Sequence, residues 1–154
     1  MTRTRLNLAA ALAVLLLAFG APLALAEDET ITPDNSSNAD FMQLKTLVDA
    51  GDYATALPQL QALNTQTPNN PDVLNLIGFS LRKTGHADQA LDFYNKALAL
   101  KPDHLGANEY LGELYLQLGD IANARRQLAR LDHLCAYGCA QREELSRWIE
   151  VASN

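Results

Sequence analysis

The chain repeats itself with a period of 34 residues. Gly51, Gly85 and Gly119 stand 34 positions apart, and each is followed five residues later by an alanine. A large apolar residue follows each alanine after four more positions, and Pro68 and Pro102 keep the same 34-residue interval. A fixed period of this length is typical of arrays in which each repeat is one supersecondary unit. Such a unit buries its apolar face only by stacking on its neighbours.

The recurring residues predict pairs of helices. Glycine takes a positive φ where a helix ends and the chain reverses, and proline cannot continue a helix. The glycines therefore mark the turn inside each repeat, and the prolines mark the link between repeats. Asp52 and Asp120 directly follow two of the glycines and place an acid near the positive end of the next helix. We expect helices over residues 39–50, 53–65, 72–84, 87–100, 105–118, 121–134 and 141–152.

Residues 71–104 resemble a tetratricopeptide repeat. The positions that carry the resemblance, in the family's order, are Leu74, Ile77, Gly78, Leu81, Gly85, Ala90, Tyr94, Ala97 and Pro102. Residues 105–136 resemble a second good copy, and residues 37–70 a weaker one, with Gln43 and Leu44 where the others have an apolar residue and Gly. The resemblance implies an all-α helical repeat solenoid of about three helix-turn-helix repeats over residues 39–134.

Residues 135–154 are expected to form a Cys-containing turn and a capping helix. Leu145, Trp148 and Ile149 fall on one face of that helix. We expect this face to cover the end of the array, with Trp148 as a core anchor. An exposed binding role for Trp148 is the alternative.

The N-terminus has the pattern of a signal peptide over residues 1–26. Arg3 and Arg5 precede an apolar run, and the small residues Ala24 and Ala26 form an acceptable cleavage site. Cleavage after Ala26 would make the protein periplasmic or otherwise exported, with no membrane insertion afterwards. An uncleaved membrane anchor is the alternative. The polar, acidic residues 27–38 predict a flexible lead-in.

Charge and motifs exclude several functions. Removing residues 1–26 takes away two arginines and no acid, so the net charge falls from −6 to −8. An acidic chain repels phosphate backbones, which disfavours nucleic-acid binding. No nucleophile elbow, phosphate-binding loop, zinc-protease or dinucleotide motif is present in the sequence. We therefore expect no enzyme and no cofactor, and we interpret His86, His104 and His133 as surface or helix-capping residues.

Two cysteines are the unusual feature of the chain. Cys135 and Cys139 are four residues apart, and helical spacing would place their Cα atoms about 6 Å apart, within disulfide range. In an oxidising compartment this pair predicts a structural disulfide. A redox-active pair is an alternative, although the spacing is not Cys-x-x-Cys. A metal site with His133 is another, although a clear fourth ligand is missing.

The resemblance also implies a binding surface. In this family the first helix of each pair lines a concave groove that takes up an extended or helical partner segment. For Phe79, the alternative to a binding role is packing against a neighbouring helix. For Arg82 and Lys83, the alternative is a solvated helix end. The groove residues do not reproduce the Lys/Asn/Arg clamp with which chaperone-adaptor members of this family bind a C-terminal carboxylate. By matching repeat positions, the exposed groove residues are expected to be Phe41, Lys45, Asn75, Phe79, Arg82, Lys83, Glu109, Glu113 and Gln117.

These observations predict an exported protein–protein interaction module, a scaffold or adaptor of the cell envelope that binds a protein or peptide segment. The first alternative is a thiol-dependent redox or metal-linked factor that uses Cys135 and Cys139. The second is an architectural subunit that self-associates through its open helical ends. We expect a monomer.

Overall fold

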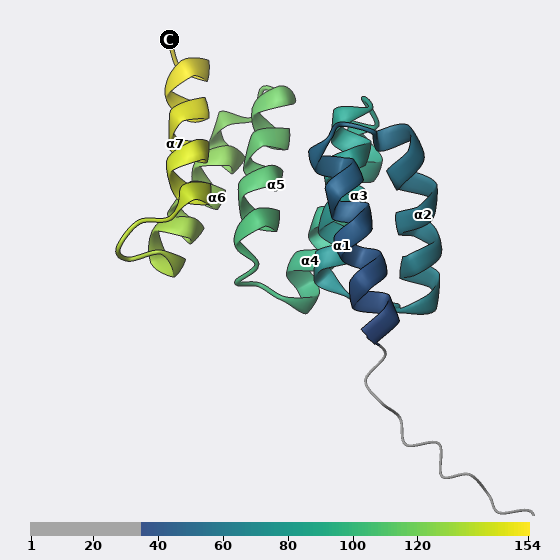
Figure 1. The fold of residues 1–154 in the computed structure, drawn as a ribbon. Helices are drawn as coiled ribbons and strands as arrows, with labels where there is room; N and C mark the ends of the chain where they lie inside the picture. The colour runs from purple at the N-terminus through teal and green to yellow at the C-terminus, as the bar shows by residue number, and fades with distance from the viewer. Residues whose placement is uncertain (1–34) are drawn as a thin grey trace, which may run out of the picture. The chain divides into compact units, whose positions relative to one another are not determined.

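The computed structural model describes residues 35–154, so the predicted signal peptide and residues 27–34 of the predicted lead-in lie outside the described residues. Within this range the chain forms seven α-helices and no strand (Figure 1), which confirms the all-α prediction. None of these helices is both long and apolar enough to cross a membrane. The helices are α1 (Asn35–Asp49), α2 (Tyr53–Gln66), α3 (Pro71–Lys83), α4 (Ala87–Leu100), α5 (Leu105–Gln117), α6 (Ile121–Leu134) and α7 (Ala140–Ala152).

The helices form three consecutive pairs and a cap. Helices α1 and α2, α3 and α4, and α5 and α6 pack as antiparallel pairs, and α7 packs on both α5 and α6. The first helices of the pairs also touch in order, α1 against α3 and α3 against α5, and α7 continues this series against α5 (Figure 1). We call α1, α3, α5 and α7 the first-helix row. This arrangement confirms the predicted three-repeat solenoid with a C-terminal capping helix.

The turn glycines behave as the period predicts. Gly51, Gly85 and Gly119 have φ angles of 80°, 86° and 76°, a region that residues with a β-carbon rarely occupy. After Gly51 and Gly119 the next residue caps the following helix with its side chain, whereas His86 after Gly85 makes no such bond. The Asp52 carboxylate accepts a hydrogen bond from the backbone N–H of Thr55 at the start of α2, and Asp120 caps α6 in the same way.

Small residues inside the helices set the distance between neighbours. A β-carbon on Gly78 of α3 would lie 2.8 Å from Cε1 of Tyr94 on α4, and Tyr94 is fully buried. The main core runs through the first five helices, and a second cluster joins α6 to α7 through Ala124, Leu131, Leu145 and Ile149. The capping helix therefore shares its core with the third repeat.

Two predictions about the ends of the array are wrong. Helix α1 begins at Asn35, four residues inside the predicted flexible lead-in, because Asn and Ser favour helix starts as well as loops. Trp148 is 46% exposed rather than buried. Leu145 and Ile149, one helical turn apart, fill the narrow stripe of α7 that faces the core, and Trp148 projects beside that stripe.

Candidate functional site

The first-helix row carries two hollows of about 300 Å³ each. The first, which we call the aromatic hollow, lies among α1, α3 and α5, and Gln141 at the start of α7 also lines it. The second, the Trp148 hollow, lies among α3, α5 and α7. Of the nine predicted groove residues, Phe41, Lys45, Asn75 and Phe79 line the first hollow. Arg82, Lys83, Glu113 and Gln117 line the second, together with Leu116, Trp148, Val151 and Ala152.

Phe79 forms part of the wall of the aromatic hollow. Its ring centroid lies 6.1 Å from that of Tyr53 and 4.6 Å from that of Tyr110, and the ring is only partly buried. Lys83 lies above the same ring, with Nζ 5.3 Å from the centroid. The alternative that Phe79 packs against its neighbours is therefore correct, and only part of its ring is exposed.

Arg82 is buried, so the prediction of an exposed basic residue at this position is wrong. Its Nη2 atom lies 2.7 Å from Oε2 of Glu113, and the two side chains are 2% and 14% exposed. Arg82 Nε has no hydrogen-bond partner among the described residues. The physical reason is the close approach of α3 to α5, which lets an arginine near the end of α3 reach across to the next repeat. This buried pair links the second and third repeats.

Glu109 is also buried, at 8% exposure, where the sequence predicted an exposed acid. It lies one helical turn before Glu113 on α5, and it makes no ion pair or hydrogen bond to any described side chain. Burial first, and then the charge of Glu113, raise the pKa of Glu109 to about 7, while Arg82 opposes the shift. The carboxyl group is therefore close to half ionised at neutral pH.

Asn75 and His104 join the second and third repeats beside the aromatic hollow. Asn75 is buried rather than exposed, because the chain at Gly106 passes close to its amide, and its Oδ1 atom has no hydrogen-bond partner among the described residues. His104 caps α5 by accepting from the N–H of Ala107, as a capping role predicts. Its Nε2 atom lies 3.0 Å from Oδ1 of Asp72 on α3.

The remaining predicted groove residues are accessible. Lys45 and Phe41 are partly buried, and Lys45 pairs with Asp49 at 2.6 Å along α1. The apolar wall contributed by α7 was not among the groove residues predicted from the sequence. It consists of Trp148 and Val151, which are 46% and 63% exposed. From the sequence, an exposed binding role for Trp148 was only the alternative and Val151 was not named, although the three-residue spacing of the two on a charged helix was an available signal.

Neither cysteine lines either hollow. The structure joins Cys135 and Cys139, with their Cα atoms 5.7 Å apart, close to the predicted separation. The bond links the end of α6 to the start of α7, and Tyr137 between them is fully exposed. Residues 35–154 contain no group of three His, Cys, Asp or Glu side chains that could hold a metal ion.

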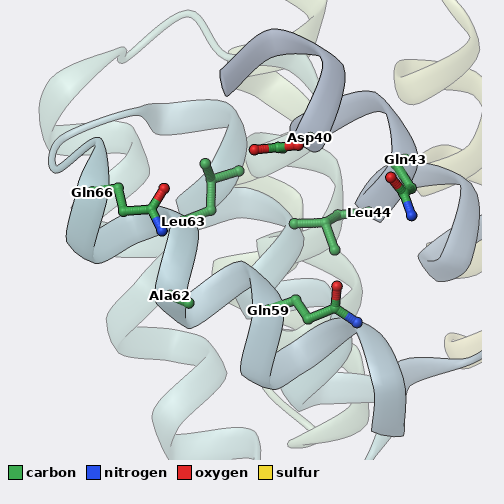
Figure 2. Close-up of a pocket in the computed structure, with 7 residues that line it drawn as sticks. All are labelled: Asp40, Gln43, Leu44, Gln59, Ala62, Leu63 and Gln66. Carbon is green, nitrogen blue, oxygen red and sulfur yellow. The ribbon is translucent and has the colours of Figure 1, made fainter. Parts of the chain in front are cut away.

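A further pocket lies between α1 and α2, at the free end of the array (Figure 2). Leu44 and Leu63 are its main apolar residues, and both are almost fully buried. Asp40, Gln43, Gln59 and Gln66 supply a polar lining, so this pocket exposes less apolar surface than the Trp148 hollow. No predicted groove residue lines this pocket. The first-helix row is therefore the better candidate site.

Comparison with known sequence families identifies the family of the repeats. Two sequence families, both described as tetratricopeptide repeat, match residues 41–104 and 81–134, and together they cover more than half of the chain. The chain belongs to the tetratricopeptide repeat family. This assignment agrees with the three repeats observed in the structure.

Relatives of known sequence match over only part of their length. The TPR repeat-containing thioredoxin TTL4 of Arabidopsis thaliana is 32% identical over 98 residues, which are 63% of this chain and 14% of that protein. The probable biofilm formation methyltransferase WspC of Pseudomonas putida is 38% identical over 80 residues, 52% of this chain and 19% of that protein. The chain thus spans less than a fifth of the length of either relative.

A solved structure shows the same fold. The Yersinia enterocolitica type III secretion chaperone SycD, in complex with a peptide of the translocator YopD, superposes with a TM-score of 0.67. The alignment covers 77% of this chain and 92% of SycD at 19% sequence identity. At that identity the likeness establishes the tetratricopeptide-repeat solenoid and no more.

Proposed function

We propose that this protein is an exported, non-enzymatic adaptor of the cell envelope that binds a segment of a partner protein along its first-helix row. Its tetratricopeptide repeats make it a protein–protein interaction module. The observation that carries the proposal is the position of the two hollows, which share one face and contain eight of the nine residues predicted for the groove.

The face is built to bind without rearranging. Its floor is held by the Arg82–Glu113 ion pair and by the contact between the rings of Phe79 and Tyr110, which are tilted by 51° to each other. A rigid floor lowers the entropic cost of binding, because few side chains are left to be ordered by the partner. The row is only four helices long, however, so we expect modest affinity.

A solved relative indicates the kind of ligand. The structure of SycD contains a peptide of the translocator YopD, which is a segment of another protein. We extend this mode of recognition, a partner segment on a tetratricopeptide-repeat array, to the present chain. The identity of that partner is not extended.

Binding is tested by capture with matched variants. The mature protein, residues 27–154, is tagged and cross-linked in cells of the source organism, and copurifying proteins are identified. The test variant is Lys83→Glu with Trp148→Ala, both in the Trp148 hollow. The control is Lys96→Glu with Leu100→Ala, an equivalent pair of exposed residues on α4. A partner lost only with the test variant supports the proposal. A partner retained by the test variant, or lost with both, contradicts it.

Export is tested by locating the chain and sequencing its N-terminus. The positive N-region, the apolar run and the Ala24–Ala26 site support cleavage after Ala26. We expect the periplasmic or secreted fraction to contain a chain that begins at Glu27. A chain that keeps Met1 and sediments with membranes would instead support the anchor alternative.

A further inference from the structure

The lining of the Trp148 hollow carries more positive than negative charge. Among the described residues it contains two cations, Arg82 and Lys83, and one carboxylate, that of Glu113. Glu109, the preceding acid of α5, lines neither hollow. The whole chain has a net charge of −6, so the lining is opposite in sign to the molecule that carries it. A locally positive surface on an acidic protein favours a ligand of negative charge.

Lys83 is the cation of this lining that has no acid of its own. Glu113 holds Arg82 at 2.7 Å, whereas Lys83 is exposed and forms no ion pair within residues 35–154. Lys83 is the last residue of α3, and its Nζ atom lies 5.3 Å from the ring centroid of Phe79. The carbonyl end of a helix and the face of a ring attract a cation, but neither carries a full negative charge. Lys83 is therefore available to an acid of a ligand.

The two cations also bring more hydrogen-bond donors than Glu113 can accept. An arginine and a lysine together carry about eight N–H donors, and a carboxylate offers about four acceptor sites. The Arg82 side chain is 2% exposed, and its Nε atom has no hydrogen-bond partner among the described residues. A ligand carboxylate supplies both acceptors and a negative charge, whereas an amide or a hydroxyl group supplies acceptors only.

Apolar side chains line the hollow beside these cations. Leu116 of α5 is partly buried, and Trp148 and Val151 of α7 are 46% and 63% exposed. Exposed aromatic residues at such surfaces commonly anchor a partner. A small acidic molecule would pair with the lysine but leave the apolar side chains in water. The lining as a whole therefore matches a ligand that carries a carboxylate and a large apolar group together.

From this juxtaposition we propose that the partner segment carries an internal Asp or Glu next to a large apolar residue: the carboxylate pairs with Lys83, and the apolar side chain packs on Leu116 and Trp148. The inference rests on the proposed function and specifies its ligand class. The carboxylate belongs to a side chain within the segment, because the groove residues do not reproduce the clamp for a terminal one.

The experiment selects peptides against the charge of the whole molecule. Two libraries of 12-residue peptides without Trp are displayed on phage, one with Asp or Glu at every third position and one with Lys or Arg there. They are pooled, depleted on the double variant Lys83→Gln with Trp148→Ala, and selected on the parent protein, residues 27–154. We expect enrichment of acidic peptides with Leu, Ile or Phe beside the acid. Unspecific attraction to a chain of net charge −8 would favour the basic library instead.

The affinity of the enriched peptides is measured with the single tryptophan of the chain as reporter. The peptides are synthesised with amidated C-termini, so that no terminal carboxylate contributes. Binding should shift Trp148 emission to shorter wavelength, because the ring loses contact with water. Lys83→Gln should weaken binding about threefold to tenfold, and replacing the peptide's acid by its amide should do the same.

The matched control is Lys96→Gln on α4. Lys96 is also exposed, and its Nζ atom lies 5.0 Å from the ring centroid of Phe93, so the two lysines have similar surroundings. Lys96 does not line the Trp148 hollow, and its substitution should leave the affinity unchanged. The helical circular dichroism signal of each variant must match the parent.

The outcomes distinguish this inference from the function on which it rests. Enrichment of the basic library, or of acidic peptides that bind Lys83→Gln as well as the parent, would overturn the acidic ligand but leave groove binding intact. An acidic peptide that binds without changing Trp148 emission would overturn the apolar contact. A shift of that emission with the concentration of the parent alone would mean that a second copy fills the hollow, which overturns the partner segment. If no peptide survives the depletion, both the inference and the proposed groove are overturned.

Discussion

Gly112 on α5 and Leu145 on α7 meet so closely that a β-carbon at position 112 would lie 2.5 Å from Cδ2 of Leu145. Leu145 is fully buried, so its side chain has little room to move aside. This contact determines how near α7 can lie to α5. It therefore also determines where Trp148, three residues after Leu145, stands beside the row.

Gly112→Ala should destabilise the protein by about 1 to 3 kcal/mol, the usual cost of overpacking a core. At an unobstructed helical position the same change stabilises by about 0.5 to 1 kcal/mol, so the sign of the effect is diagnostic. Urea unfolding followed by circular dichroism measures it. A stabilised variant would show that α7 does not pack on α5 as described.

Arg82→Leu should lower the free energy of unfolding by about 3 kcal/mol at pH 8, because it leaves Glu113 partly buried without its cation. The loss should be smaller at pH 5, where protonation of Glu109 removes part of the repulsion between the two acids. A double-mutant cycle with Glu113→Gln isolates the coupling between the two side chains. A coupling energy near zero would contradict a buried ion pair.

The raised pKa of Glu109 makes stability depend on pH. The folded state holds this proton up to about pH 7 while the unfolded state releases it near pH 4.5, so stability falls as pH rises through that window. Glu109→Gln removes this loss of stability at high pH, because the amide carries no charge at any pH. The free energy of unfolding of the variant should equal that of the parent at pH 4.5 and exceed it by about 1 to 2 kcal/mol at pH 8, a figure reduced for solvent screening.

The control for Glu109 is Glu150→Gln, which changes an exposed acid on α7. Its stability relative to the parent should not vary with pH. If Glu109→Gln follows the same flat profile, the carboxyl group is not in the buried environment described for it.

Replacing Cys135 and Cys139 together by Ser should lower the free energy of unfolding by about 2 kcal/mol, since the bond closes a very short loop. A structural bond should also resist a glutathione buffer, whereas a redox-active pair would be reduced by it. Thiol titration of the mature protein in that buffer distinguishes the two. Ready reduction, with no effect of the substitutions on stability, would favour the thiol-dependent alternative.

The sequence was sufficient to predict the helices because their signals are local. The positive φ of Gly51, Gly85 and Gly119 and the capping bonds of Asp52 and Asp120 depend only on adjacent residues. The 34-residue period then placed the row of first helices, and with it the predicted groove. The start of α1 at Asn35 was missed because polar residues are common both in loops and at helix starts.

The burial of individual groove residues could not be predicted in the same way. Whether Arg82 is exposed depends on the distance between α3 and α5, and whether Trp148 is buried depends on the rotation of α7 about its axis. Both are properties of packing between helices. Repeat positions selected nine residues, eight of which line the two hollows, but they treated these residues as exposed, although Arg82, Asn75 and Glu109 are buried.

Site-specific photo-cross-linking in living cells tests the central claim most directly. A photoreactive phenylalanine analogue replaces Lys83 or Gln117 in the Trp148 hollow, and Lys96 or Arg125 on second helices of the repeats. Binding along the first-helix row predicts a discrete adduct with one protein at positions 83 and 117 and none at positions 96 and 125. Adducts formed equally at all four positions, or only at positions 96 and 125, would contradict it.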